Sequence, residues 1–155
     1  MNKEEQLVRI LMSKKYHISF SESCTGGMCA SRLINVANAS TVLNESFVTY
    51  SNESKIKYLN VDSKTIDKYG VSSKEVAYEM AKGVAINTNS EVGVGVTGVA
   101  GPTSDGINPV GYVCFGFYIN GDIHTFDVNF NDIGRNNVRM KACDFVFDKL
   151  IELLR

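Results

Sequence analysis

The sequence has little that would tie it to a membrane or to nucleic acid. Its formal net charge is -1, so no surplus of either sign favours nucleic acid or an anionic lipid surface. No apolar run approaches the roughly 20 residues that span a bilayer. The N-terminal MNKEEQLVRI carries two glutamates where a signal peptide is basic and then apolar. We therefore expect a cytoplasmic protein with no nucleic-acid partner and no membrane partner.

Patterns of metal ligands are missing as well. The four cysteines are Cys24, Cys29, Cys114 and Cys143. They show no CxxC spacing, and the two histidines, His17 and His124, stand alone. A zinc site needs several such ligands at characteristic short spacings. We predict no metal site, and we expect the cysteines to be reduced and to pack mostly as small core residues. The chain also lacks internal repeats, linkers and low-complexity segments.

Helices and strands alternate along the chain. With 155 residues, the sequence has the length of one ordinary domain, residues 1–155. Helices are predicted over residues 2–15, 26–37, 51–59, 71–87 and 134–154. Strands are predicted over residues 17–20, 42–50, 91–98, 111–119 and 123–130. The pair Asn120-Gly121 between the last two strands is typical of a tight hairpin. This order predicts an α/β protein, a single three-layer α/β/α domain with a mixed sheet.

Polar residues mark the start of the third and fourth predicted helices. Ser51 or Asn52 can cap the third helix. Ser72 or Ser73 can cap the fourth, where Glu75 adds a capping-box pattern.

The motif SESCTGG follows the first predicted strand and leads into a helix. It is either a polar cap with a glycine turn or a nucleophile held at the start of the helix. A serine hydroxyl such as that of Ser23 becomes a nucleophile only when a base removes its proton. The backbone amides of Thr25, Gly26 and Gly27 would be ready donors for the oxyanion that forms. Cys24 is a rival nucleophile, although no histidine is paired with it.

Lys55 is the candidate base, because neither histidine lies in a triad-like motif. A free lysine amine has a pKa of about 10.4 and is almost entirely protonated at pH 7. Burial or a cationic neighbour must therefore lower that pKa by roughly two to three units. Tyr50, at the end of a strand, could relay the proton or orient the amine, but only a shared pocket could bring the two together. An edge tyrosine and a solvated lysine are the alternative.

Glycines gather at the predicted strand 91–98. Gly93, Gly95 and Gly98 spell GxGxxG, but a dinucleotide-binding fingerprint places its glycines at a strand-to-helix turn. Here the first two lie inside an apolar strand, so we expect them to let a helix pack close to the sheet.

The loop TGVAGPTSDGINP follows this strand. Its glycine-rich backbone exposes amides that can meet a phosphate or a substrate carbonyl. Thr97, Gly98 and Gly101 are the candidate substrate-binding residues. A plain connection between two strands is the alternative.

Five separated motifs cover nearly the whole chain, namely SESCTGG, FVTYSNESK, TGVAGP, NPVG and DIGRNNVR. Together they resemble the CinA C-terminal-domain family, the nicotinamide-nucleotide amidohydrolases. The resemblance implies hydrolysis of the carboxamide of nicotinamide mononucleotide to nicotinate mononucleotide and ammonia, a step of NAD salvage. It implies a small-molecule substrate and no cofactor. We expect a homodimer.

The catalytic residues of the family fall on identifiable positions. Its nucleophilic serine corresponds to Ser23, and its tyrosine and lysine correspond to Tyr50 and Lys55. Its arginine after the last strand corresponds to Arg135, with Arg139 one helical turn further on. We expect Arg135 to serve the phosphate of the substrate, with Arg139 in reserve.

The sequence departs from the family pattern in two places. The family's loop is usually richer in glycine and carries a lysine before PVG, whereas residues 102–108 read PTSDGIN, with Asn108 at that place. Many members also carry an N-terminal domain resembling molybdopterin-binding proteins. The sequence does not contain it, so no activity of that domain is carried over.

Two other functions stay open. One is hydrolysis of a different small amide by the same serine and lysine. The other is a non-catalytic nucleotide-binding domain, or an interaction domain linked with competence and DNA damage.

Overall fold

The structure, a computed structural model, describes residues 1–155 as one mixed sheet covered by helices on both faces. The strands are β1 Ile18–Glu22, β2 Phe47–Val48, β3 Val92–Gly98, β4 Tyr112–Ile119 and β5 Asp122–Asn129. The helices are α1 Lys3–Lys14, α2 Met28–Leu33, α3 Asn52–Leu59, α4 Ser63–Tyr69, α5 Lys74–Asn87 and α6 Arg135–Leu154, with a 3-10 turn at Ala39–Thr41.

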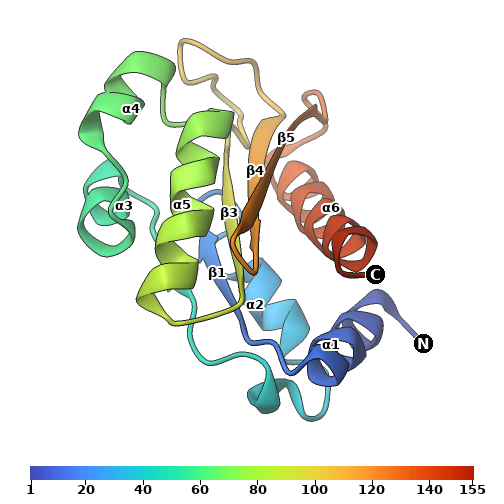
Figure 1. Cartoon of the computed structure of the whole chain (residues 1–155). Coiled ribbons are helices and arrows are strands. Elements are labelled where there is room, and N and C mark those ends of the chain that lie inside the picture. Colours follow the sequence, from blue (N-terminus) through green and yellow to red (C-terminus); the bar gives the residue numbers. More distant parts are fainter.

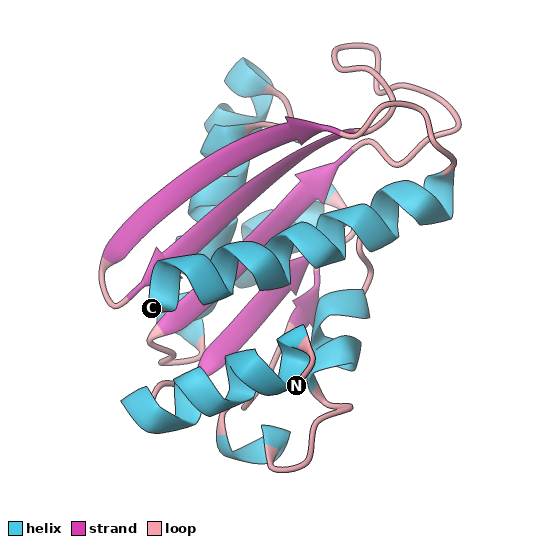
Figure 2. Ribbon diagram, turned by 90° about the vertical axis from the view of Figure 1, so that its right-hand side faces the viewer, coloured by secondary structure: helices cyan, strands magenta, loops and turns pink.

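The sheet order is β2-β1-β3-β4-β5. β1 runs parallel to both β2 and β3, while β4 is antiparallel to β3 and β5. α3, α4 and α5 lie on one face, and α1, α2 and α6 lie on the other (Figures 1 and 2). The predicted three-layer α/β/α architecture with a mixed sheet is confirmed. The carboxyl ends of the three parallel strands meet at one edge of the sheet.

Three local predictions differ from the structure. The strand predicted over 42–50 is reduced to Phe47–Val48, because the amide of Phe20 donates to the side chain of Ser46 and not to a backbone carbonyl. The second helix, predicted over 26–37, covers only Met28–Leu33. α4 was not predicted, since none of its residues is buried and it shows no apolar period.

The caps and the hairpin follow the sequence closely. The side chains of Ser51 and Ser73 accept the backbone amides of Ser54 and Val76, and so cap α3 and α5. The bond from Ser73 goes to the third helical residue, while Glu75 occupies the second, so the predicted capping box does not form. Asn120 and its following glycine adopt positive φ angles of 47° and 102° between β4 and β5, as the hairpin prediction requires.

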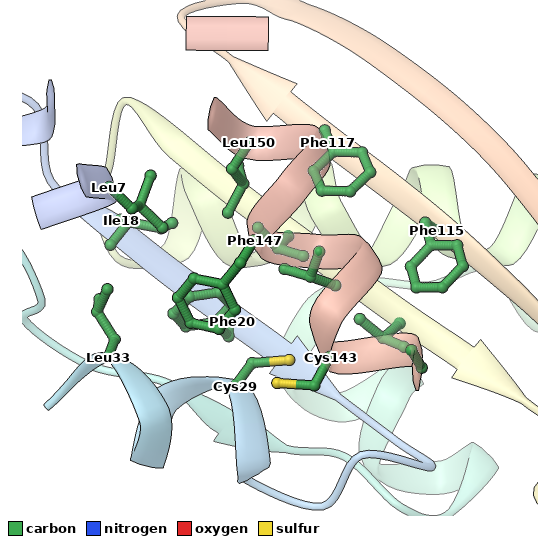
Figure 3. Close-up of a cluster of buried hydrophobic side chains, with 14 of the residues drawn as sticks. Leu7, Ile18, Phe20, Cys29, Leu33, Phe115, Phe117, Cys143, Phe147 and Leu150 are labelled. Atoms are coloured by element: carbon green, nitrogen blue, oxygen red, sulfur yellow. The ribbon is translucent and has the colours of Figure 1, made fainter. Parts of the chain in front are cut away.

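The main core lies between the sheet and the layer of α1, α2 and α6. Figure 3 shows Phe20 of β1, Leu33 of α2 and Phe147 of α6 meeting there, all fully buried. The sulfur atoms of Cys29 and Cys143 face each other in the same cluster. All four cysteines are buried and free of disulfides.

On the opposite face, glycines let α5 approach the sheet. A Cβ atom added to Gly95 would lie 2.6 Å from the carbonyl oxygen of Ala77. Gly93 and Gly116 lie equally close to the backbone of α5. The prediction that Gly93 and Gly95 serve helix packing is confirmed, and the GxGxxG pattern forms no strand-to-helix turn.

No helix combines the length and the apolar character that crossing a bilayer requires. No group of three or more His, Cys, Asp or Glu side chains is gathered as a metal ion would need.

Candidate active site

Ser23 and Lys55 meet at the carboxyl edge of the parallel strands. Ser23 follows β1 directly, and its amide donates to the carbonyl oxygen of Val96 in β3 at 3.0 Å. Lys55 lies in the first turns of α3, which begins just after the neighbouring strand β2. The Lys55 Nζ atom lies 3.1 Å from the Ser23 Oγ atom. A serine hydroxyl and an amine therefore share one hydrogen bond, although 32 residues separate them.

The amine of Lys55 is buried without an acidic partner. Its side chain is 0% exposed, and it takes part in none of the salt bridges of the molecule. Its other contacts are two backbone carbonyl oxygens, that of Thr49 at 2.7 Å and that of Tyr50 at 3.4 Å. Burial disfavours the ammonium form and lowers the pKa of Lys55 from 10.5 to about 8. About a tenth of the amine is then neutral at pH 7, compared with well under a thousandth for a free lysine.

Cys24 lies beside this pair, but its thiol is not activated. Burial raises the pKa of Cys24 to about 12. Since the thiolate is the reactive form, the thiol stays protonated at any physiological pH. This contrast favours Ser23 over Cys24 as the nucleophile.

A cavity of about 250 Å³ opens over Ser23. Three walls contribute to it: the segment after β1, the segment before α5, and the loop between β3 and β4. The lining residues are Ser23, Cys24, Tyr50, Val71, Ser72, Thr97, Gly98, Val99, Ala100, Gly101, Thr103, Asp105 and Arg135. Of the predicted substrate-binding residues, Thr97, Gly98, Gly101 and Arg135 line the cavity, whereas Thr25, Gly26, Gly27 and Arg139 do not.

The side chain of Tyr50 points to Arg135 and not to Ser23 or Lys55. Its hydroxyl accepts a hydrogen bond from Arg135 Nη2 at 2.8 Å, and the residue is 61% exposed. No hydrogen bond joins this hydroxyl to Ser23 or Lys55; only the Tyr50 carbonyl reaches the amine. Arg135 Nη1 also donates to the Gly101 carbonyl at 2.5 Å. Arg135 thus links Tyr50, which follows β2, to the loop between β3 and β4, and it keeps further N–H groups free.

Arg139 holds the backbone of segment 23–27, the serine loop. Its Nε and Nη2 atoms donate to the carbonyl oxygens of Cys24 at 2.8 Å and Thr25 at 3.2 Å. Both groups are thereby directed at the protein, away from the cavity. The expectation that Arg139 could contact a phosphate is not matched by this geometry.

Free backbone amides surround Ser23, and they include two of the three predicted donors, since the amides of Thr25 and Gly27 donate no hydrogen bond within the chain. The amide of Gly26 donates to the Ser23 carbonyl at 3.1 Å, so it is already used in a turn. The amides of Cys24, Ala100 and Gly101 line the cavity and donate no hydrogen bond within the chain. Because Thr25 and Gly27 do not line the cavity, the amides of Cys24, Ala100 and Gly101 are the better candidates to donate to an oxyanion or a substrate oxygen.

The wall formed by Val71 and Ser72 was missed from the sequence. Thr97 Oγ donates to the Val71 carbonyl at 3.0 Å, and the Asn108 side chain donates to the Ser72 carbonyl at 3.1 Å. Asp105 was missed as well; its carboxylate accepts the amide of Asn108 at 2.6 Å and so shapes the loop. The only sequence feature that pointed to these residues was the position of this loop after a parallel strand, where ligand-binding sites lie in open α/β sheets.

Comparison with known protein families tests the resemblance that the motifs suggested. The family model described as the CinA C-terminal domain matches residues 1–154. The chain belongs to the CinA C-terminal domain family. Curated relatives agree with this assignment. A competence-damage inducible protein of Alkaliphilus oremlandii is 45% identical over 148 residues, which are 95% of this chain and 36% of that protein.

A protein of the same name from Clostridium kluyveri is 44% identical over 149 residues, covering 92% of this chain and 36% of that protein. The chain therefore spans about a third of the length of the curated CinA relatives that it matches. Neither name states a reaction.

Solved CinA structures share the fold over their full length. The CinA superfamily protein of Klebsiella pneumoniae superposes with a TM-score of 0.93 at 27% identity, covering 99% of this chain and 98% of the other. The competence/damage inducible protein CihA of Agrobacterium tumefaciens gives a TM-score of 0.91 at 32% identity, covering 100% and 98%.

Proposed function

We propose that this CinA domain is an amidohydrolase in which Ser23 is the nucleophile and Lys55 the base. The observation that carries the proposal is the 3.1 Å contact between Ser23 Oγ and the Nζ atom of a fully buried lysine with no acidic partner. A structural lysine would be expected to pair with a carboxylate when buried. A lysine whose amine is buried and has no acidic partner can lose its proton near neutral pH and act as a base.

The hydrogen-bond arrangement suits a neutral amine. A neutral lysine amine has two N–H groups and one lone pair. The carbonyl oxygens of Thr49 and Tyr50 can accept the two N–H groups. The lone pair is then left for the hydroxyl proton of Ser23.

The reaction follows from this arrangement. The Ser23 proton passes to Lys55 as Oγ attacks the carbon of a carboxamide, and the oxyanion that forms is held by free backbone amides. The amide of Cys24 follows the nucleophile directly in the chain, and those of Ala100 and Gly101 belong to the loop between β3 and β4 that lines the same cavity. Lys55 returns the proton to the leaving nitrogen, and ammonia departs. Water then attacks the acyl-serine with its proton taken by Lys55; as the bond to Oγ breaks, Lys55 gives this proton to Ser23 Oγ and the carboxylic acid is released.

Nicotinamide mononucleotide is the substrate that we propose, from the family resemblance and from the cavity. Its carboxamide would face Ser23. Its phosphate would meet Arg135, whose guanidinium lines the cavity and can bind phosphate oxygens in a bidentate manner. Tyr50 would support that phosphate site, because its hydroxyl already accepts from Arg135.

The test is ammonia release by the purified protein from nicotinamide mononucleotide and from a panel of other small primary amides. The proposal predicts ammonia and nicotinate mononucleotide, with the highest kcat/KM for nicotinamide mononucleotide. Faster turnover of another amide would support the amidohydrolase activity but show that the substrate is that amide and not nicotinamide mononucleotide. Ammonia from no amide, with nicotinamide mononucleotide still bound, would favour a nucleotide-binding domain without catalysis.

A further inference from the structure

We propose that Glu22 is a positioning residue for the nucleophile. In this role, which rests on the proposed function of Ser23, its buried carboxylate fixes the start of α2 and thereby the shape of segment 23–27. Glu22 is 1% exposed and stands directly before Ser23 in the chain. It makes no contact with the cavity, so it acts through the serine loop and not on the substrate.

The carboxylate takes the place of the missing cap of α2. Its Oε1 atom accepts the amide of Cys29 at 2.8 Å, and its Oε2 atom accepts the amide of Ala30 at 3.1 Å. Gly27, the residue at the cap position, has no side chain to offer, and the first turn contains no acid. The second and third amides of a helix are those that a capping side chain normally accepts. A negative charge at this end also suits the helix dipole.

The backbone of Glu22 is fixed by the sheet at the same time. Its carbonyl accepts the amide of Thr49 at 2.9 Å, and its Cα atom is in register with Val48 of β2 and Val96 of β3. One residue therefore holds both ends of segment 23–27: its main chain fixes the end at β1, and its side chain fixes the end at α2.

The segment itself has few internal bonds that could hold its shape. Within it and at its end, the amide of Gly26 donates to the Ser23 carbonyl and the amide of Met28 donates to the Thr25 carbonyl. Arg139 holds two carbonyls from outside. The geometry leaves the amide of Cys24 free at the cavity. If α2 lost its anchor, both this amide and Ser23 Oγ would be free to move relative to Lys55.

The remaining anchor of α2 is apolar. Figure 3 shows Cys29 and Leu33 directed into the core, with the Cys29 sulfur facing Cys143 of α6. This packing can keep α2 in place without fixing its first turn to an accuracy below an ångström. Misplacement of reacting groups by about 1 Å can cost about a hundredfold in rate, so the hydrogen bonds of Glu22 matter for catalysis more than for folding.

The test compares Glu22→Gln with Asn2→Ala. The glutamine keeps the shape of the side chain but replaces one acceptor oxygen by an amino group that cannot accept an amide proton. Asn2 caps α1 in the same helical layer and lies far from the cavity, so Asn2→Ala removes a cap without touching the serine loop. Glu22→Asp, whose shorter side chain cannot reach both amides, is the second variant in case the glutamine protein does not fold.

Three measurements are made on each protein. They are kcat and KM for nicotinamide mononucleotide, the rate at which a fluorophosphonate labels Ser23, and hydrogen exchange of the amides of residues 24–27. In Glu22→Gln we expect kcat and the labelling rate to fall by about tenfold or more, an unchanged KM, and faster exchange in segment 24–27. Asn2→Ala should lower the melting temperature and leave all three measurements as in the wild type.

A Glu22→Gln protein that is less stable but keeps the wild-type kcat and labelling rate would overturn the positioning role. Failure of the proposed substrate is distinguishable, because labelling needs no substrate. If the wild-type protein is labelled at Ser23 but releases no ammonia, nicotinamide mononucleotide is not the substrate. The role of Glu22 is then judged from the labelling rates of the wild type and Glu22→Gln. If the wild type does not label at all, unchanged exchange in segment 24–27 of Glu22→Gln overturns the proposal and faster exchange supports it.

Discussion

Replacement of Lys55 by methionine should change how stability depends on pH. Burial lowers the pKa of this amine from 10.5 to about 8. Between these values the unfolded chain holds a proton that the folded protein does not, so the wild type gains stability as pH rises through this window. Below pH 8 both states are protonated, and the folded state carries the full cost of a buried ammonium. Lys55→Met fills similar space, has no amine and lacks this dependence.

The size of the effect follows from the shift. At about 1.4 kcal/mol per pKa unit, most of the shift is recovered between pH 7 and pH 10, which amounts to roughly 2 to 3 kcal/mol. The free energy of unfolding of wild type and Lys55→Met is measured by urea denaturation at both pH values. Other titrating groups cancel in the difference. The wild type should gain roughly 2 to 3 kcal/mol relative to the variant as pH rises.

The same pKa should govern catalysis. A base must be neutral to take the Ser23 proton, so kcat/KM should rise with pH and level off above an apparent pKa of about 8. Lys55→Arg is the control, because arginine keeps the charge but cannot release a proton; it should be nearly inactive. Stability curves that stay parallel from pH 7 to pH 10, together with an active Lys55→Arg protein, would refute the role of Lys55 as base.

Three further substitutions test other parts of the account. Cys24→Ala should keep kcat within about threefold of the wild type, because a thiol that stays protonated is not a nucleophile and the free amide of that residue remains; a loss of all activity would move the nucleophile to the cysteine. Arg135→Ala should raise KM for nicotinamide mononucleotide by about tenfold or more, whereas an unchanged KM with a lower melting temperature would assign the arginine a structural role. Gly95→Ala should destabilise the protein by about 1 to 3 kcal/mol, since its Cβ atom would lie 2.6 Å from the Ala77 carbonyl oxygen; an unchanged urea midpoint would contradict the packing role.

The contact between Ser23 and Lys55 was predictable from the sequence, because strand order places both residues at the same edge of the sheet. Ser23 and Lys55 follow two strands that are neighbours and parallel, and the carboxyl ends of such strands meet. The glycines of β3 were also interpretable, because glycine inside an apolar strand indicates close packing. Both predictions depend on backbone placement, which local patterns determine well.

The directions of side chains were harder to predict from the sequence. The hydroxyl of Tyr50 turns to Arg135 and not to Lys55, and Arg139 turns to the serine loop. Each direction depends on where α6 lies relative to β1 and β2, which no local pattern specifies. The wall at Val71 was missed for the same reason, because the contact with Thr97 joins segments 26 residues apart. The polar segment before β2 was extended too far as a strand, since a serine side chain replaces a ladder bond there.

The most direct test of the central claim is ammonia release from nicotinamide mononucleotide by the wild type and by Ser23→Ala. The account predicts release by the wild type and a loss of several powers of ten in kcat for the variant, with its circular dichroism spectrum and melting temperature unchanged. Wild-type turnover in a folded Ser23→Ala protein would contradict it.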